Sequence, residues 1–251
     1  MTGRQERYLE QIRRGGPLSP ALAAAFTSVP REAFVPAGFQ RRDGNWVTPG
    51  DPDFLDRVYD DDALVTKVDG KVPISSSSQP SLMALMITAL DVRPGHRILE
   101  IGAGTGYNAA LLASIGAEVT SVDVQADVAA RARAALAQAG IGGVRVEHGD
   151  GYAGFPGESF DRVIVTVGVA GISPHWLAQL APDGLVVAPV EHAGTHPVLA
   201  VRAAGEQVSA RVICAAGFMT ASGPLTATHP RSYPSPVTPG VLSDLAEHTG
   251  P

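Results

Sequence analysis

The sequence predicts an α/β fold in which a doubly wound, largely parallel sheet carries helices on both faces. Three observations support this fold. An aliphatic run at residues 98–101 leads directly into a glycine-rich turn and a helix-forming stretch. Further apolar runs follow at 117–123, 144–147 and 160–166, with helix-forming stretches between the first of them. The run at 160–166 is nearly continuous in apolar residues, as is typical of a parallel strand covered on both faces.

The composition limits the classes of protein. The chain has 251 residues, 45% of them hydrophobic, and a net charge of −6, which suits one α/β core with additions. We expect an N-terminal section at 1–90 that covers the active site, a core at 91–215 and a proline-rich C-terminal extension at 216–251. The arginines form no basic stripe, which argues against nucleic-acid binding. A lone Cys214 and the lack of a membrane-length apolar run predict a cytoplasmic protein.

The first core strand ends in a motif that predicts a ligand site. Glu100 is followed by Gly102, Gly104 and Gly106, and a helix is expected over 108–113. Glycines let the backbone pass close beneath a ligand. A dinucleotide site has the spacing Gly-x-Gly-x-x-Gly, whereas here the third glycine comes one residue earlier. This pattern resembles the first motif of S-adenosylmethionine (SAM)-dependent methyltransferases, which implies that Glu100 and the three glycines bind SAM.

The second predicted strand, 117–123, ends in a carboxylate. Asp123 lies about twenty residues past the first glycine, where an acidic residue accepts hydrogen bonds from a ribose diol in NAD and SAM sites alike. We therefore expect Asp123 and the adjacent Val124 to contact the cofactor. Asp123 could instead cap the helix expected over 125–138, and both roles could coexist.

The later strands add weaker signals. The third strand, 144–147, leads to Asp150 and Gly151, where the carboxylate either holds the adenine amino group or marks a turn. Thr166 ends the fourth strand and either lines the site or only ends the strand. A fifth strand is expected at 185–190, and a final hairpin at 197–202 and 207–215 with Gly205 at its turn. Prolines after Gly223 predict extended or irregular structure.

The N-terminal section has a different character. Short helices are predicted at 4–14 and 20–26, and the polar stretch 40–62 is predicted to be a mobile loop. A hairpin follows, with strands at 64–68 and 71–74 around an Asp-Gly turn, and then a helix at 80–90. Trp176 is interpreted as a packing residue, and Trp46 either packs or closes over substrate. His192 and His196 are not expected to bind metal, because a zinc site needs further ligands.

Five segments in order make a family resemblance specific. The chain reads VPREAFVP at 29–36, YDDD at 59–62, ISSSSQP at 74–80, then the glycine motif and Gly-Asp-Gly, and finally FDRVIVT at 160–166. This order resembles that of protein-L-isoaspartate O-methyltransferases over about residues 29 to 190. The resemblance implies a SAM methyltransferase sheet whose N-terminal additions cover the site. A carboxylate acceptor, with a pKa near 4, is already ionised at neutral pH and needs no general base.

One loop departs from the family pattern. The family has Gly-x-Gly-Gln-Thr-Ile-Ser-x-Pro, whereas this chain replaces the glycines and glutamine with residues 72–75. Aligning Ser-x-Pro places Ser78 at the family's active-site serine and Ser76 at its threonine. The resemblance implies that Ser78 positions the acceptor carboxylate, with Ser76 as its companion. A serine run could instead be a solvated loop with one serine capping the next helix.

The serine-rich loop also resembles a branch associated with ribosomally made peptides. That branch methylates an ordinary Asp side chain, and the ester then closes to an aspartimide. Gly217-Phe218-Met219 is similar to segments of the same branch. The substrate implied is a peptide or protein bearing Asp or isoAsp, including an already cyclised ribosomal peptide, with S-adenosylhomocysteine as the second product. Repair of isoaspartyl proteins is the alternative within the family. An NAD(P)-dependent oxidoreductase and a non-enzymatic peptide-binding module are the alternatives outside it.

Overall fold

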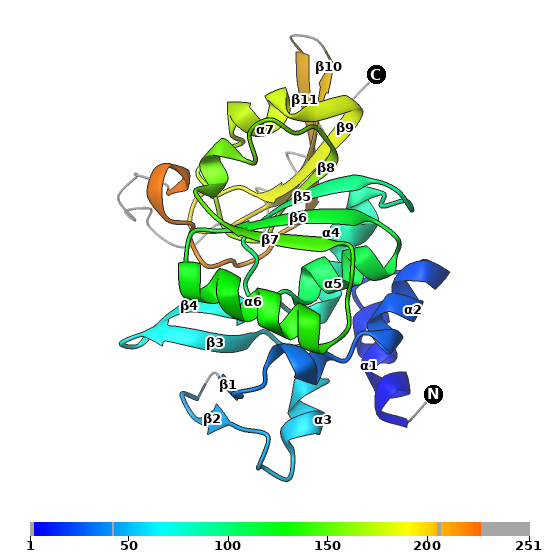
Figure 1. The fold of residues 1–251 in the computed structure, drawn as a ribbon, viewed down its shortest axis with the longest axis vertical. Helices are drawn as coiled ribbons and strands as arrows, with labels where there is room; N and C mark the ends of the chain where they lie inside the picture. The colour runs from blue at the N-terminus through cyan, green and yellow to red at the C-terminus, as the bar shows by residue number, and fades with distance from the viewer. Residues whose placement is uncertain (1–2, 42, 205–206, 227–251) are drawn as a thin grey trace, which may run out of the picture.

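The computed structural model describes residues 3–41, 43–204 and 207–226, which are built around a seven-stranded sheet (Figure 1). Its strand order is β11-β10-β9-β8-β5-β6-β7. The strands are β5 (Arg97–Ile101), β6 (Glu118–Asp123), β7 (Val144–His148), β8 (Phe160–Val165), β9 (Leu180–Pro189), β10 (Val198–Ala204) and β11 (Gln207–Cys214). β5 to β9 pair in parallel, and β10 and β11 add to them antiparallel. The predicted α/β class is confirmed.

Helices cover both faces of this sheet. One face packs against α4 (Pro80–Leu90), α5 (Tyr107–Ser114) and α6 (Ala126–Gln138). The other face packs against α7 (Pro174–Ala178) and the short 3₁₀ turns η2 (Gly151–Ala153) and η3 (Gly223–Leu225). Neighbouring strand residues therefore serve opposite layers: Ile98 faces the first and Leu99 the second, and both are fully buried. This double burial explains why the core strands are continuous apolar runs.

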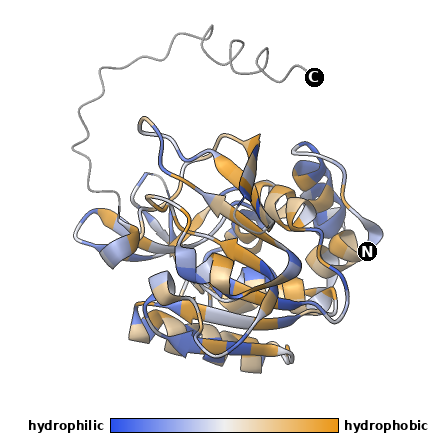
Figure 2. Cartoon of the chain, turned by 90° about the horizontal axis from the view of Figure 1, so that it is seen from above, coloured by the Kyte–Doolittle hydropathy of each residue, from blue (hydrophilic) through white to orange (hydrophobic). Residues whose placement is uncertain are grey.

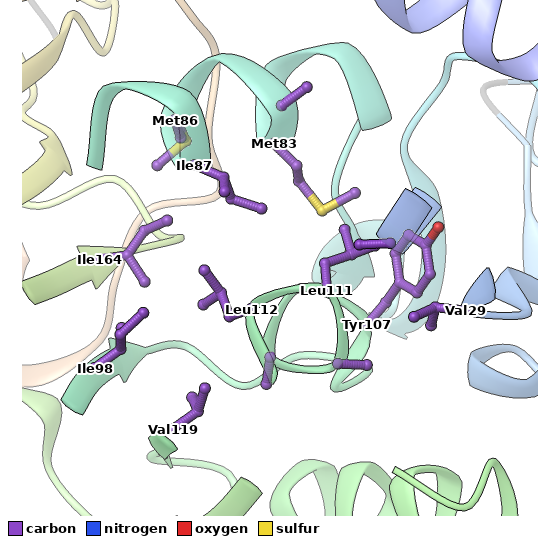
Figure 3. Close-up of a cluster of buried hydrophobic side chains, with 14 of the residues drawn as sticks. Val29, Met83, Met86, Ile87, Ile98, Tyr107, Leu111, Leu112, Val119 and Ile164 are labelled. Atoms are coloured by element: carbon purple, nitrogen blue, oxygen red, sulfur yellow. The ribbon is translucent and has the colours of Figure 1, made fainter. Parts of the chain in front are cut away.

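The larger core layer joins α4 to α5. Figure 3 shows Met83 and Ile87 of α4 pointing toward Leu111 and Leu112 of α5, with Ile164 of β8 beside them. Outer helices mix hydrophilic and hydrophobic residues along their length (Figure 2). In α6 the buried residues are Val128, Ala129, Ala132, Ala135 and Leu136, which recur at helical spacing. This packing fixes the carboxyl ends of the central strands, where the site lies.

The N-terminal section forms helices and a second sheet. α1 (Gly3–Arg13), α2 (Pro20–Ser28) and η1 (Arg31–Phe34) precede a four-stranded sheet of order β2-β1-β3-β4. Its strands are β1 (Phe39–Gln40), β2 (Trp46–Val47), β3 (Leu64–Asp69) and β4 (Val72–Ser77), and α3 (Phe54–Val58) lies between β2 and β3. The hairpin predicted after residue 63 is thus β3–β4.

The stretch 40–62, predicted to be a mobile loop, contains the short elements β2 and α3. Val47, Phe54 and Val58 are buried in one cluster with Val35, Phe39 and Leu64. These apolar residues are spaced too widely among polar ones to give a periodic signal. Trp176 is fully buried, as predicted, whereas Trp46 is 46% exposed and does not pack in the core.

The C-terminal part runs back to the sheet. Gly168 and Thr220 form an isolated parallel bridge, so the chain after β11 returns to the end of β8. The turn predicted at Gly205 and the prolines beyond residue 226 lie outside the described residues. Within the described ranges, no helix is both long and apolar enough to cross a membrane.

Candidate active site

A cavity of about 900 Å³ lies at the carboxyl ends of β5, β6 and β8. Ligands bind at this edge of open α/β sheets, and the volume is at the upper end of ordinary ligand pockets. Three walls enclose it: the glycine turn with the ends of the core strands, the strand β4 with residues 78–79, and the segment 217–222. Segments far apart in the sequence therefore meet around one space.

Residues 102–105 of the glycine turn form the floor, whereas Gly106 does not line the cavity and lies against Ala132 and Leu136 of α6. Gly102, Gly104 and Gly106 all have positive φ angles, of 96°, 53° and 87°, which L-residues rarely adopt. A Cβ on Gly102 would lie 2.7 Å from Thr166 Oγ1, and one on Gly104 would lie 2.9 Å from the Ser76 carbonyl oxygen. Thr166 Oγ1 donates to the Gly102 carbonyl at 2.6 Å. Thr166 thus both lines the cavity and holds the turn in place.

Asp123 presents its carboxylate at this floor. Oδ2 accepts a hydrogen bond from the Gly104 amide at 3.1 Å, and Oδ1 accepts one from the Gln125 amide at 2.9 Å. Burial raises the pKa of Asp123, against these amide hydrogen bonds. The side chain lies before α6 rather than at its N-cap, which is Gln125. Each oxygen retains acceptor capacity for a further donor from the cavity.

The remaining predicted cofactor residues lie at neighbouring strand ends. Val124 lines the cavity and is 49% exposed, an unusual position for a large apolar side chain. Asp150 and Gly151 line it as well, and Asp150 Oδ1 accepts from the Tyr152 amide at 2.9 Å. Asp150 therefore also caps η2. A Cβ on Gly151 would lie 2.5 Å from Ile101 Cγ2, so only glycine fits there.

Glu100, like Gly106, is a predicted cofactor residue that lies behind the cavity wall. It is fully buried and is not among the residues that line the cavity. Its carboxylate accepts hydrogen bonds from Asn108 Nδ2 and from Ser121 Oγ. Asn108 does line the cavity, and its Oδ1 is buried without a partner among the described residues. Glu100 thus reaches the cavity only through Asn108, a residue that the sequence analysis did not single out.

The serines lie on the opposite wall. Ser75 and Ser77 are buried, at 7% and 2% exposure, whereas Ser76 and Ser78 are half-buried. This alternation follows from the strand geometry of β4. All four serines line the cavity. Ser76 and Ser78, the two predicted to position the acceptor, are thus the ones with the more accessible side chains.

A buried arginine fixes the end of that wall. The Arg31 guanidinium donates to four main-chain carbonyls, those of Val58, Asp60, Asp62 and Ser78, at 2.8–3.0 Å. Arg31 is fully buried and lies over the Tyr107 ring. Arg31 thereby ties the end of β4 to the end of α3 and the stretch after it.

The third wall is held by a histidine. Phe218 lines the cavity, and its amide donates to His196 Nδ1 at 3.3 Å. The His196 amide in turn donates to the Ala216 carbonyl. The Gly168 amide donates to the Met219 carbonyl at 2.8 Å, and the Ala221 amide donates to the Gly168 carbonyl at 2.8 Å. The C-terminal segment is thus an integral wall of the site.

The electrostatics of the cavity are distinctive. Among the described residues, the side chains lining it include two carboxylates, Asp123 and Asp150, and no lysine, arginine or histidine. In the parts of the chain that the structure describes, no group of three or more His, Cys, Asp or Glu is arranged to hold a metal ion. Hydroxyls, amides and main-chain groups are therefore the groups available to orient a second ligand beside a cofactor.

These features fit SAM. The desolvated Asp123 carboxylate suits a ribose diol, the glycine turn admits the cofactor closely, and the unpartnered Asn108 Oδ1 offers an acceptor at the cavity wall. Fold and site together define a SAM-dependent methyltransferase. The profile of the protein-L-isoaspartate(D-aspartate) O-methyltransferase family matches residues 3–224. The chain belongs to this family and is a SAM-dependent protein carboxyl O-methyltransferase.

Individual relatives agree with this assignment. The chain is 39% identical over 191 residues to protein-L-isoaspartate O-methyltransferase 1 of Rhodopseudomonas palustris, which covers 74% of this chain and 69% of the relative. It is 37% identical over 206 residues to the Methylorubrum populi enzyme, covering 80% and 86%. A solved protein-L-isoaspartate O-methyltransferase superposes with a TM-score of 0.76 at 32% identity, covering 89% of this chain and 67% of the other.

A more distant structure shows the fold alone. A putative protein-L-isoaspartate O-methyltransferase from Plasmodium falciparum, solved with S-adenosyl-L-homocysteine, has a TM-score of 0.67 at 15% identity, covering 88% of this chain and 98% of the other. The family membership decides between the methyltransferase and oxidoreductase readings in favour of methyl transfer.

Proposed function

We propose that the chain methylates the side-chain carboxylate of an aspartate in a peptide precursor, and that the ester then closes to an aspartimide. The observation that carries this proposal is the acceptor wall. Residues 72–78 read Val-Pro-Ile-Ser-Ser-Ser-Ser where the family pattern has Gly-x-Gly-Gln-Thr-Ile-Ser, so both glycines are lost and Ser75 and Ser77 replace the glutamine and the isoleucine on the cavity wall. An altered acceptor wall beside an unaltered glycine turn favours a change of acceptor with the same methyl donor.

Ser78 and Ser76 are proposed to orient the acceptor. Both are half-buried on the cavity wall, and their hydroxyls can donate to a carboxylate. In the part of the chain that the structure describes, no cationic side chain lines the cavity to compete for that carboxylate. SAM supplies a methyl group on a positively charged sulfur, already activated for transfer. The acceptor oxygen forms its bond to the methyl carbon as the carbon–sulfur bond breaks, so this step needs no proton transfer.

Alignment is then the main contribution of the protein. Holding two reactants in line can lower a barrier by roughly 7 to 11 kcal/mol. Asp123, Val124, Asp150, Gly151 and the glycine turn are proposed to hold the cofactor. Glu100 is proposed to act indirectly, by holding Asn108. In the following step, the amide nitrogen of the next residue attacks the ester carbonyl and methanol leaves.

Repair of isoaspartyl proteins is the second candidate. It is favoured by the names of the relatives, which are protein-L-isoaspartate O-methyltransferases at 37–39% identity. The same wall and cofactor site would serve an isoaspartyl carboxylate. An experiment must therefore distinguish normal from isomerised aspartate. It must also distinguish a dedicated precursor from proteins in general.

The test is mass spectrometry of reactions with SAM and matched acceptors. One pair has the same generic sequence with Asp or isoAsp at one position, and a third acceptor is a precursor peptide encoded beside the gene, linear and cyclised. Methylation of the precursor followed by loss of methanol, to a species one water lighter than the starting peptide, is expected. If the generic isoaspartyl peptide is methylated and the matched aspartyl peptide is not, the proposal is wrong and the enzyme has repair-type activity.

A further inference from the structure

We propose that Gln125 is a positioning residue that couples cofactor binding at Asp123 to the placement of the acceptor strand β4. The inference rests on the proposed function in that β4 is taken to contact the acceptor. Gln125 follows the ribose-type carboxylate by two residues and lines the cavity. Its backbone belongs to the cofactor side of the site, whereas its side chain belongs to the acceptor side.

The backbone contact comes first. The Gln125 amide donates to Asp123 Oδ1 at 2.9 Å, and Oδ2 accepts from Gly104 at 3.1 Å. A ligand bound to the Asp123 carboxylate therefore restrains the start of α6. Because Gln125 is the N-cap of this helix, its backbone position is fixed by the carboxylate on one side and by α6 on the other.

The side chain contacts both strands of the hairpin. Nε2 donates to the Ile74 carbonyl of β4 at 2.8 Å, and Oε1 accepts from Lys67 Nζ of β3 at 2.9 Å. Lys67 also donates to Asp127 Oδ1 at 2.7 Å, which adds a second link to α6. A single amide thus satisfies one donor and one acceptor of the β3–β4 hairpin.

These contacts lie where the hairpin is irregular. The β3–β4 register shifts on either side of Lys67, which pairs with Ser75, and Ile74 is left without a partner in the register. An irregular ladder bends easily and is less firmly held by its neighbour strand. The Ile74 carbonyl that accepts from Gln125 directly precedes Ser75. The Gln125 amide therefore holds β4 at its irregularity, next to the serines.

The hairpin has little freedom to settle elsewhere against the core. The Ser76 carbonyl lies so close to Gly104 that a Cβ there would be 2.9 Å away. The same Gly104 amide contacts Asp123. These contacts join the Asp123 carboxylate, the glycine turn and β4 in a closed set. Gln125 is the member of this set that a single substitution can remove.

Coupling of this kind is reciprocal, because a cofactor that strengthens peptide binding must itself bind more tightly when the peptide is present. The test measures the Kd of S-adenosylhomocysteine by calorimetry with and without a saturating aspartyl or isoaspartyl peptide, in wild type and Gln125→Ala. Losing two hydrogen bonds should cost roughly tenfold in peptide KM. The cofactor Kd alone should change by less than about threefold.

The expected result is that the peptide tightens cofactor binding in wild type and no longer does so in Gln125→Ala. Gln125→Glu keeps the contact with Lys67 and loses the donor to Ile74, so it should retain part of the coupling. Lys67→Met removes only the β3 link and serves if Gln125→Ala fails to fold. Gln138→Ala, exposed at the far end of the same helix, is the control. Full coupling and an unchanged KM in Gln125→Ala would overturn the proposal.

A readout without an acceptor separates this proposal from the proposed function. S-adenosylhomocysteine should protect the amides of residues 72–78 from hydrogen exchange in wild type and not in Gln125→Ala. If wild type methylates no aspartyl or isoaspartyl peptide, the proposed function fails, while the exchange comparison still decides the role of Gln125. Equal protection in both proteins would exclude that role.

Discussion

The side-chain amide of Asn108 donates a hydrogen bond to Glu100 Oε1 at 2.7 Å, in the interior beneath the glycine turn. Ser121 Oγ donates to the other carboxylate oxygen. Burial raises the pKa of Glu100 to about 7, although both hydrogen bonds act to lower it. A carboxylate that is costly to ionise therefore supports a residue of the cavity wall.

Glu100→Gln should flatten the dependence of stability on pH. The pKa of Glu100 rises from 4.5 to about 7 on folding, so its stabilising contribution is complete below the lower value and is lost as pH rises through the higher one. That loss is on the order of 3 kcal/mol for a fully buried group. Urea unfolding across this range should show a falling free energy in wild type and a flatter one in the variant. Glu118→Gln, exposed at the start of the neighbouring strand β6, should behave as wild type.

Asp123→Asn should weaken cofactor binding. The amide keeps the shape of the side chain but loses the charge and one acceptor, and its NH₂ group faces the Gly104 or Gln125 amide. Hydrogen bonds to charged groups contribute about 1.5 to 3 kcal/mol, which predicts a Kd for S-adenosylhomocysteine raised roughly tenfold to a hundredfold. Calorimetry measures this directly. An unchanged Kd would remove Asp123 from the cofactor site.

Ser78→Ala should lower kcat/KM for the acceptor roughly tenfold to a hundredfold, because a hydroxyl that donates to a carboxylate is lost. The Kd of S-adenosylhomocysteine should stay within about threefold. Ser77→Ala offers a contrast in stability: Ser77 Oγ is buried and has no hydrogen-bond partner among the described residues, so its removal should raise the free energy of unfolding by up to about 1 kcal/mol. A Ser78→Ala enzyme with full kcat/KM would exclude the positioning role.

Arg31→Met should destabilise the protein by roughly 3 to 5 kcal/mol, because four carbonyls lose their donors in a buried setting. Arg31→Lys should recover part of this loss, since an ammonium has fewer donors and no planar fork. Unfolding in guanidinium chloride measures the free energy of unfolding of each variant. Arg57→Gln is the control, since its partners Asp53 and Asp60 are exposed, and it should change stability by less than about 0.5 kcal/mol.

His196→Asn should reduce the acid sensitivity of the C-terminal wall. Neutral His196 accepts from the Phe218 amide, and protonation of Nδ1 would abolish that bond. Burial lowers the pKa of His196 below 6.5, opposed by Glu191. Its stabilising contribution is therefore present above that value and is lost as pH falls through the folded pKa. Peptide KM should rise on acidification in wild type and less in His196→Asn. His192→Gln, exposed in the preceding loop, should keep the wild-type profile.

The sequence predicted those parts of the fold whose signal is local. The β5 run, the glycines and Asp123 are close in the chain, and each has a conformational or chemical reason visible in the residue type. The structure of the stretch 40–62 depends instead on long-range packing. The burial of Val47, Phe54 and Val58 became clear only once Val35 and Leu64 were beside them, and periodicity within the segment carries no such information.

The site followed the same division. Residues at strand ends were predicted because the ends of parallel strands must meet at one edge of the sheet. Gln125 and His196 were missed because their partners lie 51 and 22 residues away, and Asn108 was missed because its contact with Glu100, eight residues before it, depends on how the glycine turn folds back. Gln125 could have been suspected from its position two residues after Asp123, but nothing in the chain indicated that Ile74 would lie beside it.

Strand β4, which is proposed to contact the acceptor, belongs to the four-stranded sheet, which has its own buried cluster, and not to the seven-stranded sheet that carries Asp123. Substitutions in the four-stranded sheet can therefore accumulate without changing the seven-stranded sheet. Segment 35–78 could therefore be exchanged between relatives as one unit. If Gln125 and Arg31 are kept to hold it in place, the chimera should acquire the peptide specificity of the relative and keep its own SAM binding.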